Sequence, residues 1–296
     1  MKKVIVITGP TAVGKTKLSI ELAKKINGEV INADSTQVYR ELDIATAKIK
    51  EDEKENIKHH LFDIRDISED YTVFDYQSDV RKIIADIINE GKTPILVGGT
   101  GLYIKACLYD YKFDKEKVMN NYDELSNEEI FNLLKSKDKN IDIHINNRKR
   151  MIRALNYINN SNELYSEKVK TSKLFYDAIF IGLTTDRETL YERINRRVDV
   201  MLSEGLVDEA KEIFNKNIRS KAVLTPIGYK ELFMYFENKI SLEEALSLIK
   251  QRSRNYAKRQ YTWFNNQMDI KWFNTDFINF DKTVKEVIKY INSLNT

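Results

Sequence analysis

The sequence predicts an α/β fold in which a parallel sheet carries helices on both of its faces. Two observations predict it. Short apolar runs alternate with helical segments along the first third of the chain, and a glycine-rich turn joins the first run to the first helix. Strands that are apolar along their whole length are typical of parallel sheets, which are buried on both faces. The 296 residues suffice for one large or two ordinary domains with a substantial core.

The predicted strands are short and mostly β-branched. In order they are Val4 to Thr8, Val30-Ile31, Pro94 to Val97 and Ile179 to Leu183. The predicted helices carry apolar residues at helical spacing. They cover Lys15 to Ile26, Val73 to Asn89 with Gly91 as its stop, Asn127 to Lys135, Arg187 to Glu204, Val207 to Asn217, Lys230 to Glu237 and Leu242 to Phe264. We therefore expect an almost entirely helical C-terminal half after Leu183.

A polar stretch rich in Lys and Asn interrupts this alternation between the third and the fourth strand. It contains one amphipathic helix and no strand pattern. We expect residues 111–146 to form a small helical insertion domain. Residues 1–110 and 147–296 would then form the catalytic core with its C-terminal helices.

Composition excludes several classes of protein. With 42% hydrophobic and 31% charged residues the chain is globular and not disordered. No apolar run approaches the ~18 residues of a membrane span. Its one cysteine, Cys107, cannot form an intrachain disulfide, which favours a reducing, cytoplasmic location. Cys107 stands in an apolar run, so we expect a packed core thiol, with a reactive thiol as the alternative. Without a heptad pattern or an apolar patch, we expect a monomer.

A P-loop motif follows the first predicted strand. It consists of Gly9, Pro10, Thr11, Ala12, Val13, Gly14, Lys15 and Thr16, and a predicted helix begins within it. In such a loop the backbone N–H groups turn inward, and the helix directs its positive dipole end to the same point. Lys15 would reach a terminal phosphate, and the Thr16 hydroxyl would bind Mg²⁺. We therefore expect a P-loop NTPase-like core that holds a diphosphate or triphosphate.

Two further polar segments follow predicted strands at the same edge of the sheet. Asp34 comes just after Val30-Ile31, where its carboxylate could serve as a metal partner or a general base, or simply as a helix N-cap, a role that Ser35 also fits. Gly98 to Gly101 form a second glycine-rich turn. There the Thr100 hydroxyl could approach a phosphate or the reacting atom.

Basic residues gather in the C-terminal half. From Ala245 to Met268 there are five of them and no acid, and Arg252, Tyr256, Arg259 and Trp263 share one helical face. Such a face suits RNA, because cations bind phosphates and rings stack on unpaired bases. The alternative is a solvated charged face with its aromatic rings in the core. Further clusters, namely Arg148 to Arg150 with Arg153, and Arg193 with Arg196 and Arg197, favour RNA.

Together these segments resemble the tRNA dimethylallyltransferase family, the isopentenyl transferases that modify an adenine beside the anticodon. The resemblance extends over nearly the whole chain. It is carried by residues 9–16, 34–39, 43–48, 60–64, 97–103, 146–150, 152–155, 227–231, 258–260 and 262–264. Two segments depart from the family pattern. They are Thr225-Pro226, where the family usually has a Gln-Ala-like pair, and His144-Ile145, where His-Pro is more usual.

The resemblance implies transfer of a dimethylallyl group from dimethylallyl diphosphate to N6 of adenine 37, in tRNAs that read codons beginning with U. It implies catalytic roles for Asp34 as the base, Thr100 in orienting the amine, and Lys15 and Arg197 on the leaving diphosphate, with Mg²⁺ as the cofactor. It also implies contacts with the tRNA anticodon stem-loop. These would come from Asp34, Ser35, Thr36, Gln37, Thr100, Tyr122, Lys149, Arg150, Met151, Ile152, Arg153, Lys258, Arg259 and Trp263.

Two other functions fit part of the sequence. A small-molecule or nucleotide kinase would account for the P-loop and for the Arg193 to Arg197 helix, but not for the basic aromatic helix. A non-catalytic RNA-binding protein switched by a nucleotide would leave Asp34 and Thr100 without a role. His59 and His60 have no matching ligand cluster, so we expect them to be structural.

Overall fold

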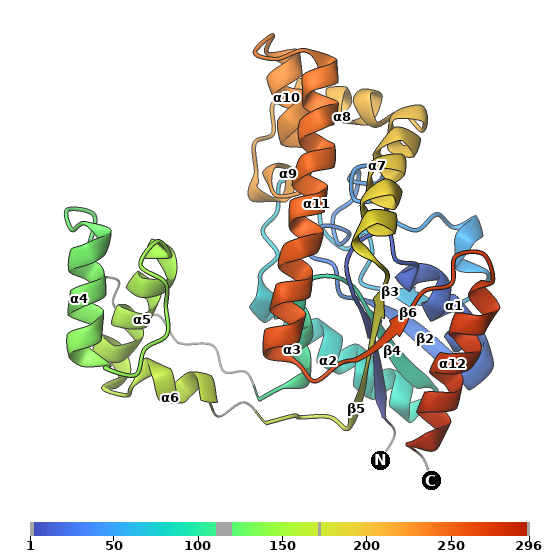
Figure 1. Cartoon of the computed structure of the whole chain (residues 1–296), viewed down its shortest axis with the longest axis horizontal. Coiled ribbons are helices and arrows are strands. Elements are labelled where there is room, and N and C mark those ends of the chain that lie inside the picture. Colours follow the sequence, from blue (N-terminus) through green and yellow to red (C-terminus); the bar gives the residue numbers. More distant parts are fainter. Residues whose placement is uncertain (1–2, 111–119, 171–172, 295–296) are drawn as a thin grey trace. The chain divides into compact units, whose positions relative to one another are not determined.

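A sheet of parallel strands organises the computed structural model, which describes residues 3–110, 120–170 and 173–294 (Figure 1). Within these residues the strands are β1 (Val4–Thr8), β2 (Gly28–Asn32), β3 (His59–His60), β4 (Thr93–Val97), β5 (Ala178–Thr184) and β6 (Lys271–Asn274). Their order in the sheet is β3-β2-β4-β1-β5-β6, and each neighbouring pair is parallel. The predicted α/β fold is confirmed, and the four predicted strands correspond to β1, β2, β4 and β5.

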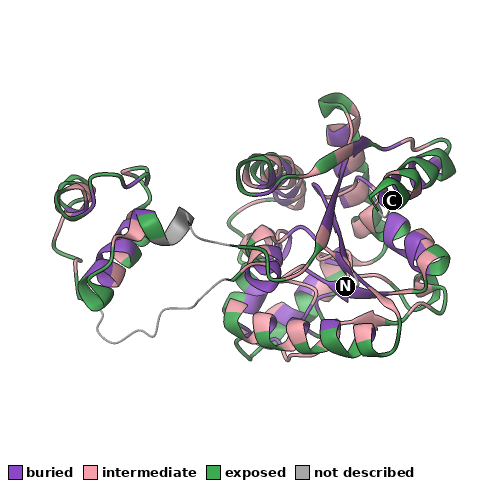
Figure 2. Cartoon of the chain, turned by 90° about the horizontal axis from the view of Figure 1, so that it is seen from below, coloured by how far each residue is buried: buried purple, intermediate pink, exposed green. Residues whose placement is uncertain are grey.

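Helices cover both faces of this sheet (Figure 1). The helices of this part of the chain, including those that pack on other helices and not on the sheet, are α1 (Lys15–Ile26), α2 (Val73–Asn89), α3 (Gly101–Leu108), α7 (Arg187–Ser203), α8 (Leu206–Asn215), α9 (Lys221–Leu224), α10 (Tyr229–Phe236), α11 (Leu242–Gln267) and α12 (Phe280–Ser293). Helices α1 and α12 lie on one face, and α2 and α3 on the other. The four central strands, β2, β4, β1 and β5, are almost wholly buried, as Figure 2 shows in purple.

The apolar pattern of β1 explains this layering. All five of its side chains are buried, because successive residues of a strand point to opposite faces and both faces carry helices. Ile5 and Ile7 pack in one cluster with Leu18 and Leu22 of α1. Cys107 on α3 is fully buried, as expected for a core thiol, and burial raises its pKa to about 12.

Side-chain caps set the start of the longest helices. The Thr72 hydroxyl accepts from the Asp75 amide, and the Asp75 carboxylate accepts from the Thr72 amide, so α2 begins with a reciprocal capping box. Ser241 and Glu244 repeat the arrangement at α11. In the described part of the chain, no helix combines the length and the apolar character that crossing a bilayer requires.

The C-terminal half is mostly helical, as expected, and it also contains the short strand β6. This short strand pairs with β5 and leads into α12, neither of which was predicted. Both support the P-loop. The Thr275 hydroxyl donates to the Val13 carbonyl at 3.0 Å, and a β-carbon at Gly14 would lie 2.9 Å from the Phe280 ring.

The chain divides into two compact units, and the insertion is larger than expected. One unit contains Met1–Leu108 and Tyr176–Thr296, and the other is Tyr109–Phe175. The insertion therefore continues well beyond the predicted boundary at residue 146. Its helices are α4 (Asn127–Lys137), α5 (Arg148–Ser161) and α6 (Tyr165–Lys170).

Apolar packing explains why α5 belongs to the insertion. Ile130 and Leu134 of α4 share a core with Ala154, Leu155 and Ile158 of α5, so neither helix would bury its apolar face alone. Asp138, at the C-terminal end of α4, links this helix to α6. Its carboxylate accepts hydrogen bonds from the amide of Ser166 at 2.7 Å and from the hydroxyl of Ser166 at 2.8 Å.

Candidate active site

A cavity of about 810 Å³ opens at the carboxyl end of the central strands. The loops after β1, β2 and β4 meet there because the strands are parallel, and open α/β sheets bind their ligands at this edge. Helices α7 and α11, and the segment from Thr225 to Ile227, contribute further walls. Its lining includes Thr11, Ala12, Gly14, Lys15, Thr16, Asp34, Ser35, Thr36, Gln37, Thr46, Ala47, Gly98, Gly99, Arg193, Arg197, Ser253, Tyr256, Arg259 and Gln260.

The predicted P-loop forms a turn between β1 and α1. Gly9 and Gly14 have positive φ angles of 133° and 95°, and a β-carbon at Gly9 would lie 2.4 Å from the Leu183 carbonyl oxygen. Ala12, at φ 67°, adopts the left-handed conformation without being glycine. The Lys15 ammonium donates to the carbonyls of Gly9 at 3.0 Å and Pro10 at 2.7 Å, which folds it over the loop.

Two enclosed cations face the cavity from the loop and from α7. Burial lowers the pKa of Lys15 to about 7, and the charge of Arg197 acts in the same direction, while Asp34 opposes it. Burial also lowers the pKa of Arg197, against the attraction of Asp34. The Arg197 guanidinium donates to neutral groups, the Thr11 hydroxyl at 3.3 Å and the Ala47 carbonyl at 3.5 Å. An anion bound here would therefore compensate charges that the protein itself offsets only in part.

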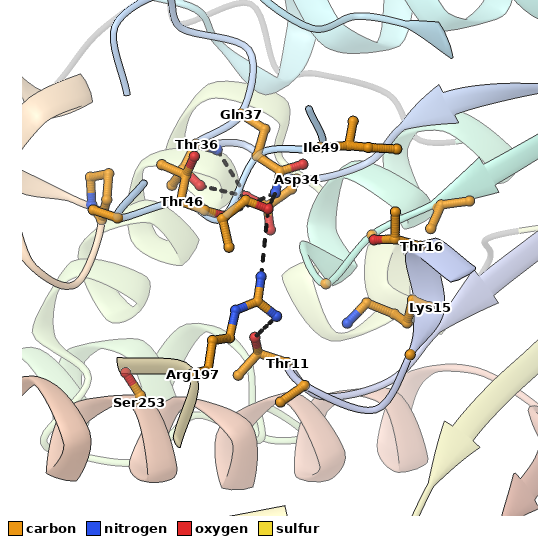
Figure 3. A pocket seen from close by; sticks show the side chains of 18 of the residues that line it. Thr11, Lys15, Thr16, Asp34, Thr36, Gln37, Thr46, Ile49, Arg197 and Ser253 are labelled. Carbon is orange, nitrogen blue, oxygen red and sulfur yellow. Dashed lines mark hydrogen bonds between the residues drawn. The ribbon is translucent and has the colours of Figure 1, made fainter. Parts of the chain in front are cut away.

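Asp34 lies on the loop after β2, where Thr36 binds its carboxylate and Asn32 binds its backbone. One of its carboxylate oxygens, Oδ1, accepts from the Thr36 amide at 3.0 Å and the Thr36 hydroxyl at 2.7 Å. This is a local turn and not a helix N-cap, because no helix follows; the N-cap alternative is wrong for both Asp34 and Ser35. Figure 3 shows Asp34, Arg197 and Lys15 around one open space.

Asn32, which sequence reasoning did not single out, fixes the backbone of this loop. Its buried amide donates to the carbonyls of Asp34 and Leu61, both at 3.0 Å, and its Oδ1 accepts from the Asp34 amide at 2.8 Å. Tyr76 donates to the Asn32 carbonyl at 2.9 Å. A buried polar side chain needs hydrogen-bond partners. The position of Asn32, a polar residue at the end of an apolar strand, could therefore have indicated this role from the sequence.

Gln260 is the second residue that the prediction of the site omitted. It is 5% exposed, and its amide donates to the Gly99 carbonyl at 3.1 Å. A β-carbon at Gly99 would lie 2.1 Å from that amide nitrogen, so glycine is needed for the close approach of α11 to this turn. The neighbouring Thr100 hydroxyl accepts from the Ser35 amide at 3.0 Å and lies 3.3 Å from the Ser35 hydroxyl.

Three of the five basic residues of α11 make internal contacts, and one of these three, Arg252, belongs to the predicted face. Lys250 pairs with Asp199 at 2.5 Å, Arg252 pairs with the buried Glu231, and Arg254 donates to Asn195 at 2.6 Å. The Trp263 ring is half-buried and packs where a β-carbon of Gly101 would lie, 2.1 Å from the indole. Lys258 and Arg259 are exposed, and Arg259 lies 5.6 Å over the Tyr256 ring, on the cavity wall.

The predicted RNA-contacting residues of the insertion lie on or beside α5 in the second unit. Lys149, Arg150 and Arg153 are exposed there, and Ile152 is half-buried. The Tyr122 hydroxyl accepts from Asn159 at 3.0 Å. The Met151 side chain is fully buried in the core of this unit, so only its backbone is available to RNA. The Arg148 guanidinium is used inside this unit, where it donates to the carbonyls of Leu125 and Tyr122.

The two histidines differ in their surroundings. His60 contacts the buried Glu29 at 2.6 Å, beside Lys92, away from the cavity lining. His59 does line the cavity. Its Nδ1 contacts the Ile57 carbonyl at 2.7 Å, and burial lowers its pKa. In the described residues no group of three His, Cys, Asp or Glu side chains could hold a metal ion.

Comparisons with known proteins agree with this geometry. The model of the IPP transferase family matches residues 37–267, well over half of the chain. This chain belongs to the IPP transferase family. Among curated relatives, the tRNA dimethylallyltransferase of Anoxybacillus flavithermus is 47% identical over 98% of this chain and 96% of its own length. That of Macrococcus caseolyticus is 46% identical over 96% and 94%.

Solved structures of the family share the fold. The tRNA delta(2)-isopentenylpyrophosphate transferase of Staphylococcus epidermidis matches with a TM-score of 0.75 and 42% identity, over 99% of this chain and 100% of that one. A eukaryotic dimethylallyltransferase acting on tRNA matches with a TM-score of 0.83 and 33% identity, over 97% of this chain and 78% of that one.

Proposed function

We propose that this chain transfers a dimethylallyl group from dimethylallyl diphosphate to N6 of adenine 37, in tRNAs that read codons beginning with U. The observation that carries the proposal is that the Asp34 carboxylate and the enclosed cations Lys15 and Arg197 line the same cavity. Such a cavity suits a reaction that removes a proton on one side and releases an anion on the other. Relatives named for this activity, close to half identical over nearly the full length, support the same assignment.

The proposed reaction is a displacement at the allylic carbon. The N6 lone pair forms the new C–N bond while the bond from that carbon to the diphosphate oxygen breaks, and the electron pair of the broken bond leaves with diphosphate. An aromatic amine is a poor nucleophile, so its proton must be removed as the bond forms. Asp34 is the proposed base. Thr36 occupies Oδ1, which leaves Oδ2 to accept the proton.

The other residues would stabilise the leaving group. The P-loop amides, Lys15 and Arg197 would bind the diphosphate as its negative charge grows. Thr16 would hold Mg²⁺ together with diphosphate oxygens, which is the role of the hydroxyl at this position of a P-loop. When bound, the ion would add positive charge to the leaving group. Thr100, which contacts Ser35 next to Asp34, would orient the amine.

RNA binding would use Arg259 and Lys258 of α11, with Lys149, Arg150 and Arg153 of the insertion. The adenine must leave its stack to enter a cavity of this kind. Since its substrate is tRNA, we place the reaction in the cytoplasm.

The direct test incubates the protein with dimethylallyl diphosphate and an anticodon stem-loop RNA. We expect one dimethylallyl group per RNA on adenine 37 by mass spectrometry, with equimolar release of diphosphate. A parallel reaction replaces dimethylallyl diphosphate with ATP, and we expect no phosphoryl transfer. ATP cleavage without an alkylated RNA would overturn the proposal in favour of a kinase.

A further inference from the structure

Arg193 of α7 is a cation of the cavity lining that the proposed reaction does not use. Its Nε donates to the Ala12 carbonyl at 2.9 Å, and its guanidinium carbon lies over the Phe277 ring, 3.7 Å from the ring centre. An arginine that stacks on a ring keeps its hydrogen-bonding edge in the plane that the ring sets. Phe277, on the segment between β6 and α12, therefore determines how Arg193 meets the P-loop.

The residue that Arg193 binds has a strained backbone. Ala12 adopts the left-handed conformation, with a φ of 67°. In this conformation the β-carbon of an L-residue comes close to the following carbonyl oxygen, so a residue other than glycine adopts it at a cost in free energy. The hydrogen bond from Arg193 ends on the carbonyl of this same residue and offsets part of that cost.

The next peptide unit of the loop is held in a similar way. The Thr275 hydroxyl, at the end of β6, donates to the Val13 carbonyl at 3.0 Å. The N–H and the C=O of a trans peptide point in opposite directions, so the amides of Val13 and Gly14 are directed away from these two anchors. No hydrogen bond within the described residues uses either amide. Successive amides in a turn form concave anion sites, so these two suit phosphate oxygens.

We propose that Arg193 is a positioning residue for the diphosphate. It holds the Ala12 carbonyl, so that the Val13 amide stays directed to the phosphate oxygens, and Phe277 in turn holds Arg193. The inference rests on the proposed function, because it requires a diphosphate in the P-loop. Arg193 would act through the loop, whereas Arg197 would bind the phosphates directly.

The first test uses Phe277, which lies outside the cavity lining in the described part of the chain. Calorimetry measures the affinity for inorganic diphosphate, and steady-state kinetics give KM and kcat with dimethylallyl diphosphate. Phe277→Leu removes the ring and keeps an apolar side chain, whereas Phe277→Tyr keeps the ring. Ile278→Ala is the matched control, because Ile278 is the next residue and is fully exposed. Thermal unfolding of each variant checks that it folds.

We expect Phe277→Leu to weaken diphosphate binding about threefold to tenfold, the effect of losing a cation–π contact. KM should rise by a similar factor while kcat changes little. Phe277→Tyr should lose less than Phe277→Leu, and Ile278→Ala should bind like the wild type.

The loss at Phe277 should depend on Arg193. Arg193→Gln should itself weaken diphosphate binding about tenfold to a hundredfold, the effect of one lost hydrogen bond from a charged group. In that variant, Phe277→Leu should have no further effect. Wild-type affinity in Phe277→Leu, or a loss that adds in full to that of Arg193→Gln, would overturn the proposal.

A second test separates positioning from direct contact with the phosphates. Glycine adopts a positive φ without strain, so the loop of Ala12→Gly should depend less on Arg193. We expect Arg193→Gln to weaken diphosphate binding less in Ala12→Gly than in the wild type. An equal loss in the two proteins would show that Arg193 binds the phosphates itself, and would overturn the positioning role.

These outcomes are separable from the proposed function. If the wild type binds diphosphate and alkylates adenine 37 but Phe277→Leu matches it, only the role of Arg193 is wrong. If the wild type binds no inorganic diphosphate and alkylates no RNA, the proposed function fails before Arg193 is considered.

Discussion

Thr36 donates two hydrogen bonds to the same carboxylate oxygen of Asp34, one from its backbone amide at 3.0 Å and one from its hydroxyl at 2.7 Å. The pair lies on one short turn, so the orientation of the carboxylate depends on a residue two positions further along the chain. The two bonds occupy Oδ1, and Asp34 lines the cavity. The sequence of this segment does not reveal that Thr36 binds only one of the two carboxylate oxygens of Asp34.

Replacing Thr36 by Val should slow the transfer while leaving substrate binding in place. Val keeps the shape and the amide bond but removes the hydroxyl bond to a charged group, which contributes about 1.5–3 kcal/mol. We expect kcat to fall about tenfold to a hundredfold, with little change in KM for dimethylallyl diphosphate. Thr36→Ser, which keeps the hydroxyl, should stay near wild type; equal losses in the two variants would contradict an orienting role.

Replacing Asp34 by Asn tests the base directly. Asn keeps the shape and still accepts from Thr36, but it cannot take the proton from N6. Turnover should fall about 10²- to 10⁴-fold, the range for loss of a general base, with RNA affinity nearly unchanged. Single-turnover rates and equilibrium binding to the stem-loop separate the two effects. A collapse of RNA binding with a normal rate at saturation would make Asp34 a binding residue.

The sequence alone predicted most of the sheet, because its evidence is local. Val4 to Ile7 are all apolar and β-branched, and Gly9 follows one residue later, which suffices to identify a buried strand. The strand β6 escaped prediction because only one of its four side chains, Phe273, is fully buried, so no apolar run marks it. The boundary of the insertion escaped as well, since only the packing of α5 on α4 assigns Arg148–Ser161 to that unit.

The site was predictable where a motif carries it, and not where tertiary contacts do. Gly9 to Thr16 and Asp34 follow strands in sequence, so their meeting follows from a parallel sheet. Gln260 reaches Gly99 from a helix far along the chain, and no spacing in the sequence predicts that contact. Fewer basic side chains of α11 are free to bind RNA than its sequence suggests. Lys250 and Arg252 pair with acids that come from other helices.

The lowered pKa of Lys15 predicts a pH dependence of diphosphate binding. Its pKa falls from the ordinary 10.5 to about 7 in the free protein, so above pH 7 the side chain is increasingly neutral. Bound diphosphate favours the ammonium, and binding must then take up a proton. We expect affinity for inorganic diphosphate to weaken as pH rises from about 7.5 to 8.5, by up to about tenfold. Calorimetry in buffers of different ionisation enthalpy measures the proton uptake.

Lys15→Arg is the control, because an arginine stays charged over this range. Its affinity should change less with pH, and its binding should take up fewer protons. The lowered pKa of Lys15 also affects the stability of the free protein. Between about pH 7 and 10.5, Lys15 is protonated more often in the unfolded chain than in the folded one. Its contribution therefore makes the free energy of unfolding rise with pH. Equal pH slopes for wild type and Lys15→Arg would show that Lys15 is already charged in the free protein.

The glycines after β4 should differ in what an added methyl group costs. A β-carbon at Gly98 would lie 2.2 Å from the backbone of Ala33, which cannot move without shifting β2. At Gly99 it would meet only the end of the Gln260 side chain. We expect Gly98→Ala to lower the free energy of unfolding by more than the 1–3 kcal/mol usual for overpacking, and Gly99→Ala by about that amount.

Only the Gly99 variant should be rescued. In the double variant Gly99→Ala with Gln260→Ala the clash is gone, so chemical denaturation should show a smaller loss than the two single losses added together. Gln260→Ala should give no such recovery to Gly98→Ala. Strictly additive losses at Gly99 and Gln260 would mean that their contact does not limit the approach of α11.

Glu209 of α8 holds a loop of the cavity through its backbone. The carboxylate accepts from three consecutive amides, those of Asp43 at 3.1 Å, Ile44 at 2.8 Å and Ala45 at 3.1 Å, and from the Tyr229 hydroxyl at 2.7 Å. Three such amides form a concave anion site, which Glu209 fills from another part of the chain. The same loop continues to Ala47, whose carbonyl accepts from Arg197.

Glu209→Gln should therefore loosen the loop and weaken the diphosphate site at a distance. The variant turns an amide donor toward backbone N–H groups, so at least one of the bonds to a charged acceptor is lost, at about 1.5–3 kcal/mol. We expect faster hydrogen exchange at residues 43–45 and a higher KM for dimethylallyl diphosphate, with a smaller change in kcat. Tyr229→Phe removes one bond and leaves the three amides bound, so its exchange at 43–45 should stay near wild type. Unchanged exchange in Glu209→Gln would mean that the loop keeps its conformation without the carboxylate.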